Sequence, residues 1–302
     1  LETIKRPNFF YVGHTRSGTT SLKEELDQHP EIYFYYPKSW KKPNGPFGFE
    51  SSFKSEEEFL EEFRGVTEKR IGQKRGDYLS CPWAAEKIKK FSPNAKIIMT
   101  LRNPIDVMYS LHSTMLYRET VEDIIDFEEA WNLSWERKKG NCIPKRCRES
   151  KTLFYHEIAN FYEQIQYLYK FFPKSQVKII EFQKFSKSNL NVYKDVLDFL
   201  NLEYDGKKEF KKINERKEHK SKLAANLINF ERPQSLKRIT NKIKEKLGIV
   251  KIPIWSHFFY LIKKLNKKTI KAKPINKKMK MIIDSHYDLS YKKLLEEIKG
   301  NG

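Results

Sequence analysis

The segment that most constrains this chain is a short apolar stretch that leads directly into a glycine-bounded loop and a polar helix. Residues 9–12 are aromatic and β-branched, which predicts a buried strand. The loop that follows begins at Gly13 and ends at Gly18, and the pattern then predicts a helix over residues 19–28. Backbone N–H groups in such a loop, and at the N-terminus of a helix, favour a bound anion. The segment therefore predicts a phosphate-binding loop.

This loop lacks one side chain that nucleotide triphosphatases need. Their phosphate loops carry Lys followed by Ser or Thr directly after the second glycine, but Thr19 occupies that position here. The loop carries its positive charge on Arg16 instead. The pattern argues against hydrolysis of ATP or GTP, and it leaves a P-loop nucleotide kinase only as an alternative interpretation.

Two further apolar stretches extend the sheet. Residues 96–101 and 176–182 predict buried strands, and helices are expected at 105–118 and 190–200. Strands that alternate with helices are typical of an α/β fold, with a mainly parallel central β-sheet flanked by helices.

The last third of the chain differs in composition. Residues 205–285 are rich in lysine, and two stretches within them, 236–247 and 255–265, have the apolar spacing of basic amphipathic helices. We expect these helices to pack on the core, although such helices can also lie on membranes. The expected organisation is one domain over residues 1–302, with a variable helical extension over 205–302.

Two motifs in this order resemble those of sulfotransferases that use 3′-phosphoadenosine 5′-phosphosulfate (PAPS), of the bacterial and heparan-sulfate type. RSGTTSL at residues 16–22, followed by HPEI at 29–32, resembles the phosphosulfate loop of that family. KIIMTLRNP at 96–104, with Ser110 eight residues beyond Arg102, resembles its 3′-phosphate motif. Together with weaker similarities further on, the resemblance spans residues 8–202 and implies a P-loop-type fold.

The resemblance implies transfer of a sulfuryl group from PAPS to a hydroxyl or amine of a small-molecule or saccharide acceptor, with 3′-phosphoadenosine 5′-phosphate (PAP) as the product. The roles carried over fall on the loop and on the second motif. Arg16 and the loop amides would stabilise the leaving oxygens, and Arg102 would hold the 3′-phosphate. The complete set of PAPS-binding residues implied is Arg16, Ser17, Gly18, Thr19, Thr20, Ser21, Arg102 and Ser110.

The chain departs from the family at the catalytic base. Relatives carry Lys-Glu-Pro some nine residues after His-Pro, and that Glu is thought to act as the base; here Lys38 matches the Lys, but Ser39 replaces the Glu. Lys38 and Lys74 would flank the sulfuryl group or the acceptor. The candidates left open for the base are His14, Asp77, His112 and, with a shifted register, Glu50. An amine acceptor would need no strong base.

Charge bears on the choice of partners. The chain has 59 Lys and Arg against 39 Asp and Glu, a formal net charge of +20. Such an excess favours anionic partners, and it motivates a non-catalytic polyanion-binding protein as the second alternative. We interpret most of the lysines as solvated surface, and we expect no nucleic-acid partner. The sequence shows no cluster with metal-ligand spacing, so no metal is expected.

No run of 18 apolar residues occurs, which predicts no transmembrane helix. The expected location is the cytoplasm, with a trimmed N-terminal targeting or anchor segment as the alternative.

Overall fold

A computed structural model describes most of the chain in ten segments, namely residues 4–14, 16–35, 55–76, 78–117, 121–145, 147, 150–210, 216–219, 267–270 and 276–299. The chain divides into two compact units. The first comprises Leu1–Met108, His156–Asn214 and Asn276–Gly302, and the second comprises Tyr109–Tyr155 and Glu215–Ile275. A single domain over 1–302 stays a prediction.

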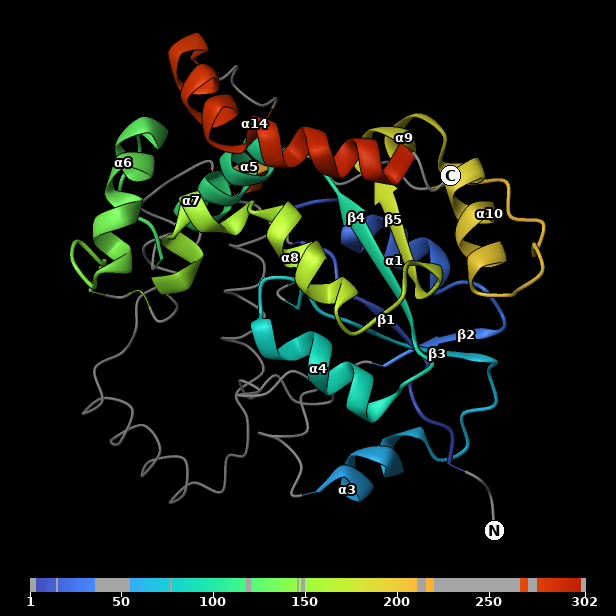
Figure 1. Cartoon of the computed structure of the whole chain (residues 1–302). Coiled ribbons are helices and arrows are strands. Elements are labelled where there is room, and N and C mark those ends of the chain that lie inside the picture. The colour runs from blue at the N-terminus through green and yellow to red at the C-terminus, as the bar shows by residue number, and fades with distance from the viewer. Residues whose placement is uncertain are drawn as a thin grey trace, which may run out of the picture. The chain divides into compact units, whose positions relative to one another are not determined.

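A five-stranded parallel sheet forms the centre of the first unit (Figure 1). Its strands are β1 (Phe9–Tyr11), β2 (Ile32–Phe34), β3 (Arg70–Lys74), β4 (Lys96–Leu101) and β5 (Val177–Glu181). They lie in the order β2-β3-β1-β4-β5, and every pairing is parallel. The predicted α/β fold is therefore confirmed. The strand that leads into the glycine-bounded loop is the central one.

The central strand owes its place to its apolar side chains. Phe9, Phe10 and Tyr11 have no exposed surface, as expected of a parallel strand covered on both faces. Phe9 pairs in register with Gly72 of β3, and a Cβ at Gly72 would lie 2.2 Å from the Phe9 ring. The glycine therefore makes room for the aromatic ring beside it.

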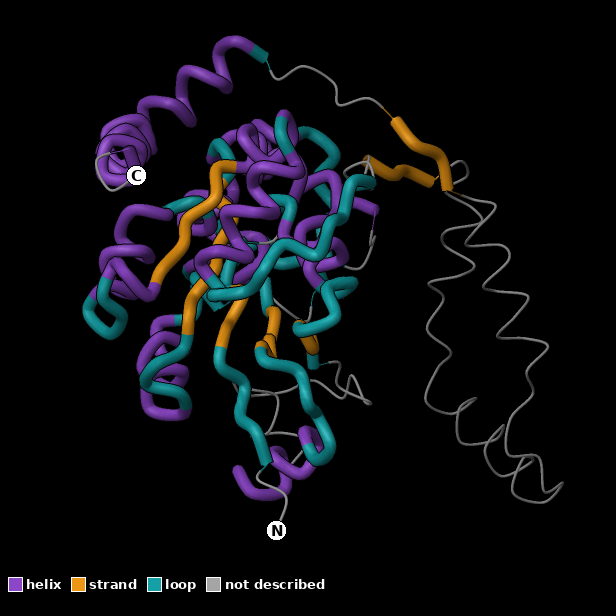
Figure 2. Tube along the Cα trace, turned by 90° about the vertical axis from the view of Figure 1, so that its right-hand side faces the viewer, coloured by secondary structure: helices purple, strands orange, loops and turns teal. Residues whose placement is uncertain are grey.

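Helices flank this sheet in the first unit. They are α1 (Thr19–Leu26), α3 (Glu56–Leu60), α4 (Pro82–Phe91), α8 (Phe161–Tyr169), α9 (Phe182–Lys187), α10 (Asn189–Phe199), α14 (Lys277–Lys299) and the first turn of α5 (Pro104–Tyr117). Figure 2 shows helices on both sides of the strands. Leu22 of α1 and Val196 of α10 belong to one buried cluster with Ile98 of β4.

The C-terminal helix α14 packs on the first unit through one face. Its buried side chains recur at intervals of four and seven residues, at Met279, Ile283, Tyr287 and Leu294. A helical C-terminal part is thus present. The two basic helices expected at 236–247 and 255–265 lie outside the described residues.

The second unit contains α6 (Phe127–Lys138), the remainder of α5 and an antiparallel pair of strands, β6 (Arg216–His219) and β7 (Lys267–Ile270). α7 (Tyr155–Ile158) begins at its boundary. Within the described part of the chain, no helix is both long enough and apolar enough to cross a membrane.

Candidate active site

The glycine-bounded loop leaves the carboxyl end of β1 and ends where α1 begins. Arg16 has φ of 71° and Gly18 has φ of 82°, so both lie in the left-handed region. Gly18 is also the residue that caps the N-terminus of α1, and a Cβ there would lie 2.5 Å from the ring of Phe182. An l-residue other than glycine would meet both backbone strain and a steric clash at this position. Backbone strain of this kind in a non-glycine residue such as Arg16 is typical of functional loops.

The start of the loop is held against the neighbouring strand β4. A Cβ at Gly13 would lie 2.5 Å from Cγ2 of Thr19 and 3.2 Å from the backbone nitrogen of Thr100. The hydroxyl groups of Tyr11 and Thr100 are hydrogen-bonded to each other. Burial raises the pKa of Tyr11, so this phenol stays protonated. These contacts fix the loop beside the carboxyl end of β4, where Arg102 follows.

The Ser17 side chain of the loop has no exposed surface. Its N–H donates to the His14 carbonyl at 3.3 Å, but its hydroxyl makes no hydrogen bond to a described residue. Most buried polar groups have partners, and one that has none calls for an explanation such as a bound ligand.

The two threonines that open α1 face different surroundings. Thr19 is 4% exposed, whereas Thr20 is exposed and its hydroxyl accepts a hydrogen bond from Nζ of Lys74 at 3.0 Å. Burial lowers the pKa of Lys74, and the nearby charge of Lys23 lowers it further. A desolvated ammonium group beside a phosphate-binding loop gains stability when an anion arrives.

Arg102 connects the second motif to the loop. Its Nη1 donates to the carbonyl of Arg16 at 3.1 Å, and its guanidinium carbon lies 4.7 Å from the ring centre of Phe182. Its Nε is 3.5 Å from Oδ2 of Asp106, but it is buried and makes no hydrogen bond within the described residues. Arg102 thus has donor capacity that no group of the described protein uses fully.

The histidines proposed as bases are both buried. His14 is 4% exposed, and its ring packs edge-on against Phe161 in the first unit. His112 belongs to the second unit, where its Nε2 lies 2.9 Å from the carbonyl of Ile124 and its ring packs on Phe127.

The other predicted site residues belong to the second unit or lie outside the described residues. Ser110 belongs to the second unit, is 7% exposed, and its carbonyl accepts a hydrogen bond from the Thr114 hydroxyl at 2.8 Å. Lys38 and Asp77 lie outside the described residues, as do Ser39 and Glu50.

The structure therefore brings together the loop residues, Lys74 and Arg102 at the carboxyl ends of β1, β3 and β4. Phe182 also belongs to this group, and sequence reasoning missed it. Its only sequence signal is its place directly after the strand at 177–181. Among the described residues, no group of three or more His, Cys, Asp or Glu is arranged to hold a metal ion.

Three known proteins similar to this chain are sulfotransferases. A crystal structure of a sulfotransferase from Alicyclobacillus acidocaldarius aligns with a TM-score of 0.56 and 26% identity, covering 74% of this chain and 91% of that one. The membrane-associated sulfotransferase kil1 of Dictyostelium discoideum is 22% identical over an alignment of 281 positions, which covers 69% of this chain. The chain spans 59% of the length of kil1. A mouse sulfotransferase, SULT7A1, solved in complex with PAP, aligns with a TM-score of only 0.41 at 17% identity, and covers 67% of this chain and 60% of that one.

A family comparison covers more of the chain. The model of the sulfotransferase domain matches residues 6–246, which include the loop, the five parallel strands and Arg102. Since this match covers more than half of the sequence, the chain belongs to the sulfotransferase domain family.

Proposed function

We propose that this sulfotransferase takes its sulfuryl group from PAPS and transfers it to a hydroxyl or amine of a small-molecule or saccharide acceptor. One observation carries the proposal. Ser17 Oγ and Arg102 Nε are both buried and both lack a hydrogen-bond partner among the described residues. They lie at the two places where the sequence predicts contacts with the nucleotide, so the residues present fit a ligand with two separate anionic groups.

The loop is proposed to bind the 5′-phosphosulfate end. Its backbone N–H groups and the N-terminus of α1 supply donors and a positive dipole. Arg16, Ser17, Thr19 and Thr20 add side-chain donors. The complete proposed set keeps the residues expected from the sequence, which are Arg16, Ser17, Gly18, Thr19, Thr20, Ser21, Arg102 and Ser110.

Arg102 is proposed to bind the 3′-phosphate and so to distinguish PAPS from ATP. Guanidinium groups form charge-assisted, bidentate hydrogen bonds with phosphate. Arg102 is held by the Arg16 carbonyl and by the face of Phe182, so it is oriented before the nucleotide arrives. The part assigned to Ser110 rests on the family motif alone.

Sulfuryl transfer breaks the bond between sulfur and the bridging oxygen of the donor while the acceptor attacks from the opposite side, so negative charge develops on the leaving oxygen. Catalysis then depends on positioning and on electrostatic stabilisation. Arg16 and Lys74 are the described cations proposed to oppose that charge. Lys38 is proposed to assist them from the acceptor side.

A base must take the proton of a hydroxyl acceptor. His14 is the candidate within the described first unit, because it belongs to the loop itself and an imidazole suits proton transfer near neutral pH. Asp77 is the other proposed base, on the sequence argument alone. An amine acceptor would reduce the need for either.

Thermal unfolding with adenosine 3′,5′-bisphosphate, ADP and ATP in parallel tests the nucleotide assignment. A ligand at 100 times its Kd adds about 2.7 kcal/mol to the free energy of unfolding. We expect the bisphosphate to stabilise the wild type most, and Arg102→Ala to abolish that preference. Arg64→Ala is the matched control, because the Arg64 side chain is 54% exposed and follows the 3-10 turn Glu61–Phe63 after α3. Equal stabilisation by the three nucleotides would refute PAPS as the donor and favour simple polyanion binding.

A further inference from the structure

Phe182 lies beside Arg102 because of the register of two parallel strands. Leu101, the last residue of β4, pairs with Glu181, the last residue of β5. Arg102 and Phe182 are each the next residue of the chain, so both follow the carboxyl ends of neighbouring strands. The guanidinium carbon of Arg102 lies 4.7 Å from the ring centre of Phe182. The pairing of the strands thus determines which side chain lies against the arginine.

The ring of Phe182 also contacts the glycine-bounded loop. A Cβ at Gly18 would lie 2.5 Å from both Cδ2 and Cε2 of the ring, so the glycine backbone packs against this ring edge. The ring is half-buried and packs on the cluster that contains Leu22 of α1. Nη1 of Arg102 donates directly to the carbonyl of Arg16 in the same loop. The loop and Arg102 are therefore linked twice, once by a hydrogen bond and once through the ring.

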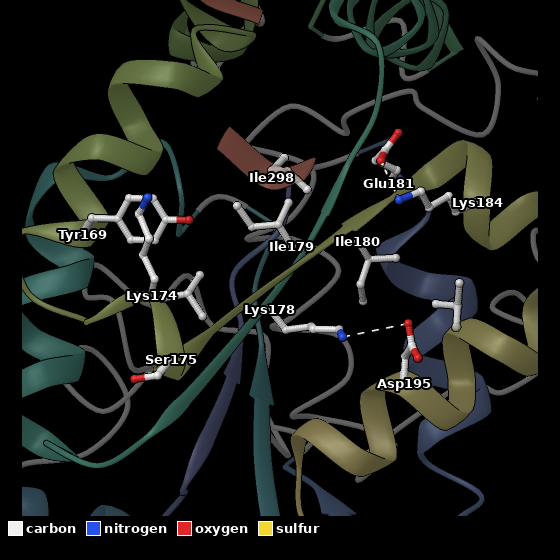
Figure 3. Close-up of a pocket in the computed structure, with 12 residues that line it drawn as sticks. Tyr169, Lys174, Ser175, Lys178, Ile179, Ile180, Glu181, Lys184, Asp195 and Ile298 are labelled. Carbon is white, nitrogen blue, oxygen red and sulfur yellow. Dashed lines mark ion pairs between the residues drawn. The ribbon is translucent and has the colours of Figure 1, made fainter. Parts of the chain in front are cut away.

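The acidic neighbour of Phe182 is engaged elsewhere. Glu181 lines a cavity of about 420 Å³ along the outer edge of β5, and its Oε1 lies 3.0 Å from Nζ of Lys184 (Figure 3). Asp106 already lies 3.5 Å from Nε of Arg102, so a second carboxylate there would occupy further donors and repel an arriving phosphate. An aromatic face holds a guanidinium group without using its N–H donors. Phe182 therefore restrains the arginine and leaves its donors to a ligand.

We propose that Phe182 is a positioning residue of the donor site, whose ring fixes Arg102 relative to the loop and so sets the spacing between the two anion-binding groups. The inference rests on the proposed function. PAPS carries both anionic ends on one molecule, so it gains from both contacts only if the loop and Arg102 keep a matching spacing. Phe182 acts through Arg102 and not by contact with the nucleotide.

A double-mutant cycle of Phe182→Leu and Arg102→Ala tests the inference, with binding of adenosine 3′,5′-bisphosphate and ADP measured by isothermal titration calorimetry. Leucine is apolar but offers no aromatic face to the guanidinium group. Phe182→Leu should therefore weaken bisphosphate binding about threefold or more. Binding of ADP, which lacks the 3′-phosphate, should change by less than about twofold. In the Arg102→Ala background, Phe182→Leu should weaken bisphosphate binding by less than about twofold.

Two further variants are controls. Phe182→Tyr keeps the aromatic ring and should keep the wild-type preference for the bisphosphate over ADP. Phe199→Leu is the matched control, because Phe199 is half-buried, packs on the same cluster, and has Nζ of Lys96 4.8 Å from its ring centre. Lys96 begins β4, whereas Arg102 follows its end. Phe199→Leu should therefore lower the melting temperature and preserve the ratio of the two affinities.

The outcomes separate the inference from the proposed function. A wild type that prefers the bisphosphate, with Phe182→Leu retaining that preference in full, overturns the inference and leaves the proposed function standing. Losses from Phe182→Leu and Arg102→Ala that multiply in the double variant also overturn it, because Phe182 would then act independently of the arginine. An equal loss of preference in Phe199→Leu overturns it as well, since the effect would be a general loosening of the fold. A wild type without any preference overturns both.

Discussion

Each unit has a described group of buried polar side chains; the one in the second unit is fully hydrogen-bonded, and the one in the first unit is not. In the second unit, Arg137 and Glu122 are both fully buried and are joined by two hydrogen bonds of 2.7 Å. The Tyr155 hydroxyl donates to the same carboxylate at 2.8 Å, and the N–H groups of Asp123 and Ile124 also donate to it, each at 3.0 Å. In the first unit, the Ser17 hydroxyl and Arg102 Nε make no hydrogen bond to a described residue, and Oδ2 of Asp106 lies 3.5 Å from Arg102 Nε.

The difference separates structural from functional polar groups. Burial alone raises the pKa of Glu122, but the hydrogen bonds and charge of Arg137 outweigh it and hold the pKa below its ordinary value. Arg137 and Glu122 therefore satisfy each other's charge and hydrogen-bonding groups, and the cluster needs no ligand. The loop and Arg102 keep donors that an anion could use. Variants of each region should consequently change different quantities.

The largest expected effect is on stability, from Glu122→Ala. Removing this carboxylate leaves the buried charge of Arg137 unpaired, which should lower the free energy of unfolding by about 3–5 kcal/mol. Urea denaturation measures the change. Glu61→Ala is the control, because Glu61 pairs with Arg64 at the surface, where the two side chains are 50% and 54% exposed. That variant should be nearly as stable as the wild type. Equal losses in the two variants would contradict the view that the buried pair is structural.

The next largest effect is expected from Gly18→Ala, which should lower the stability of the protein and weaken bisphosphate binding. The new methyl group would be forced toward Phe182 while the residue keeps φ of 82°. Such strain costs about 1–3 kcal/mol, and a displaced loop should weaken bisphosphate binding at least about tenfold. Calorimetry and urea denaturation measure the two parts.

Gly65→Ala is the matched control for this substitution. Gly65 has φ of 78°, close to that of Gly18, but nothing lies within 4 Å of its Cβ position. The free energy of unfolding of this variant should fall by about 1 kcal/mol because of backbone strain alone, and the variant should bind the bisphosphate normally. If both variants retain binding, the loop tolerates displacement and is not a precise anion site.

The sequence predicted three of the five parallel strands, β1, β4 and β5, because each contains a run of large apolar residues. It did not predict β2 or β3. β2 is a three-residue apolar run like β1, so its local pattern could have indicated a strand. β3 has charged ends and an internal glycine at Gly72. Its strand conformation depends on pairing with neighbours, above all on the packing of Gly72 against Phe9, and no local pattern reports such pairing.

The candidate site shows the same limit. The loop and Arg102 could be predicted because each lies in a run of consecutive residues whose types suit phosphate binding. Phe182 could not, because it reaches the site from a segment about 80 residues beyond Arg102. Its contribution follows from how β5 and the start of α9 pack beside the loop, and that is tertiary information.

The smallest expected effect is a gain in stability, whereas the preceding variants lose stability. Lys74→Met removes an ammonium group that burial disfavours, so the variant should be more stable at neutral pH by about 0.5 kcal/mol or more. It should also bind the bisphosphate more weakly, because Thr20 loses its cationic partner. Lys69→Met, at an exposed position before β3, should change neither quantity.

The sign of the predicted change in stability follows from how the charge of Lys74 depends on pH. The pKa of Lys74 is lower in the folded protein than in the unfolded chain, so the unfolded chain binds more protons in the interval between the two values. The free energy of unfolding of the wild type should therefore rise with pH across that interval, up to the ordinary lysine value, and the variant should lack this slope. Anion binding raises the pKa of Lys74, so the wild type should take up protons on binding the bisphosphate at alkaline pH, which calorimetry in buffers of different ionisation enthalpy detects. If Lys74→Met is less stable than the wild type and binds the bisphosphate equally tightly, then the role of Lys74 is structural, like that of Arg137 and Glu122, and not one of anion binding.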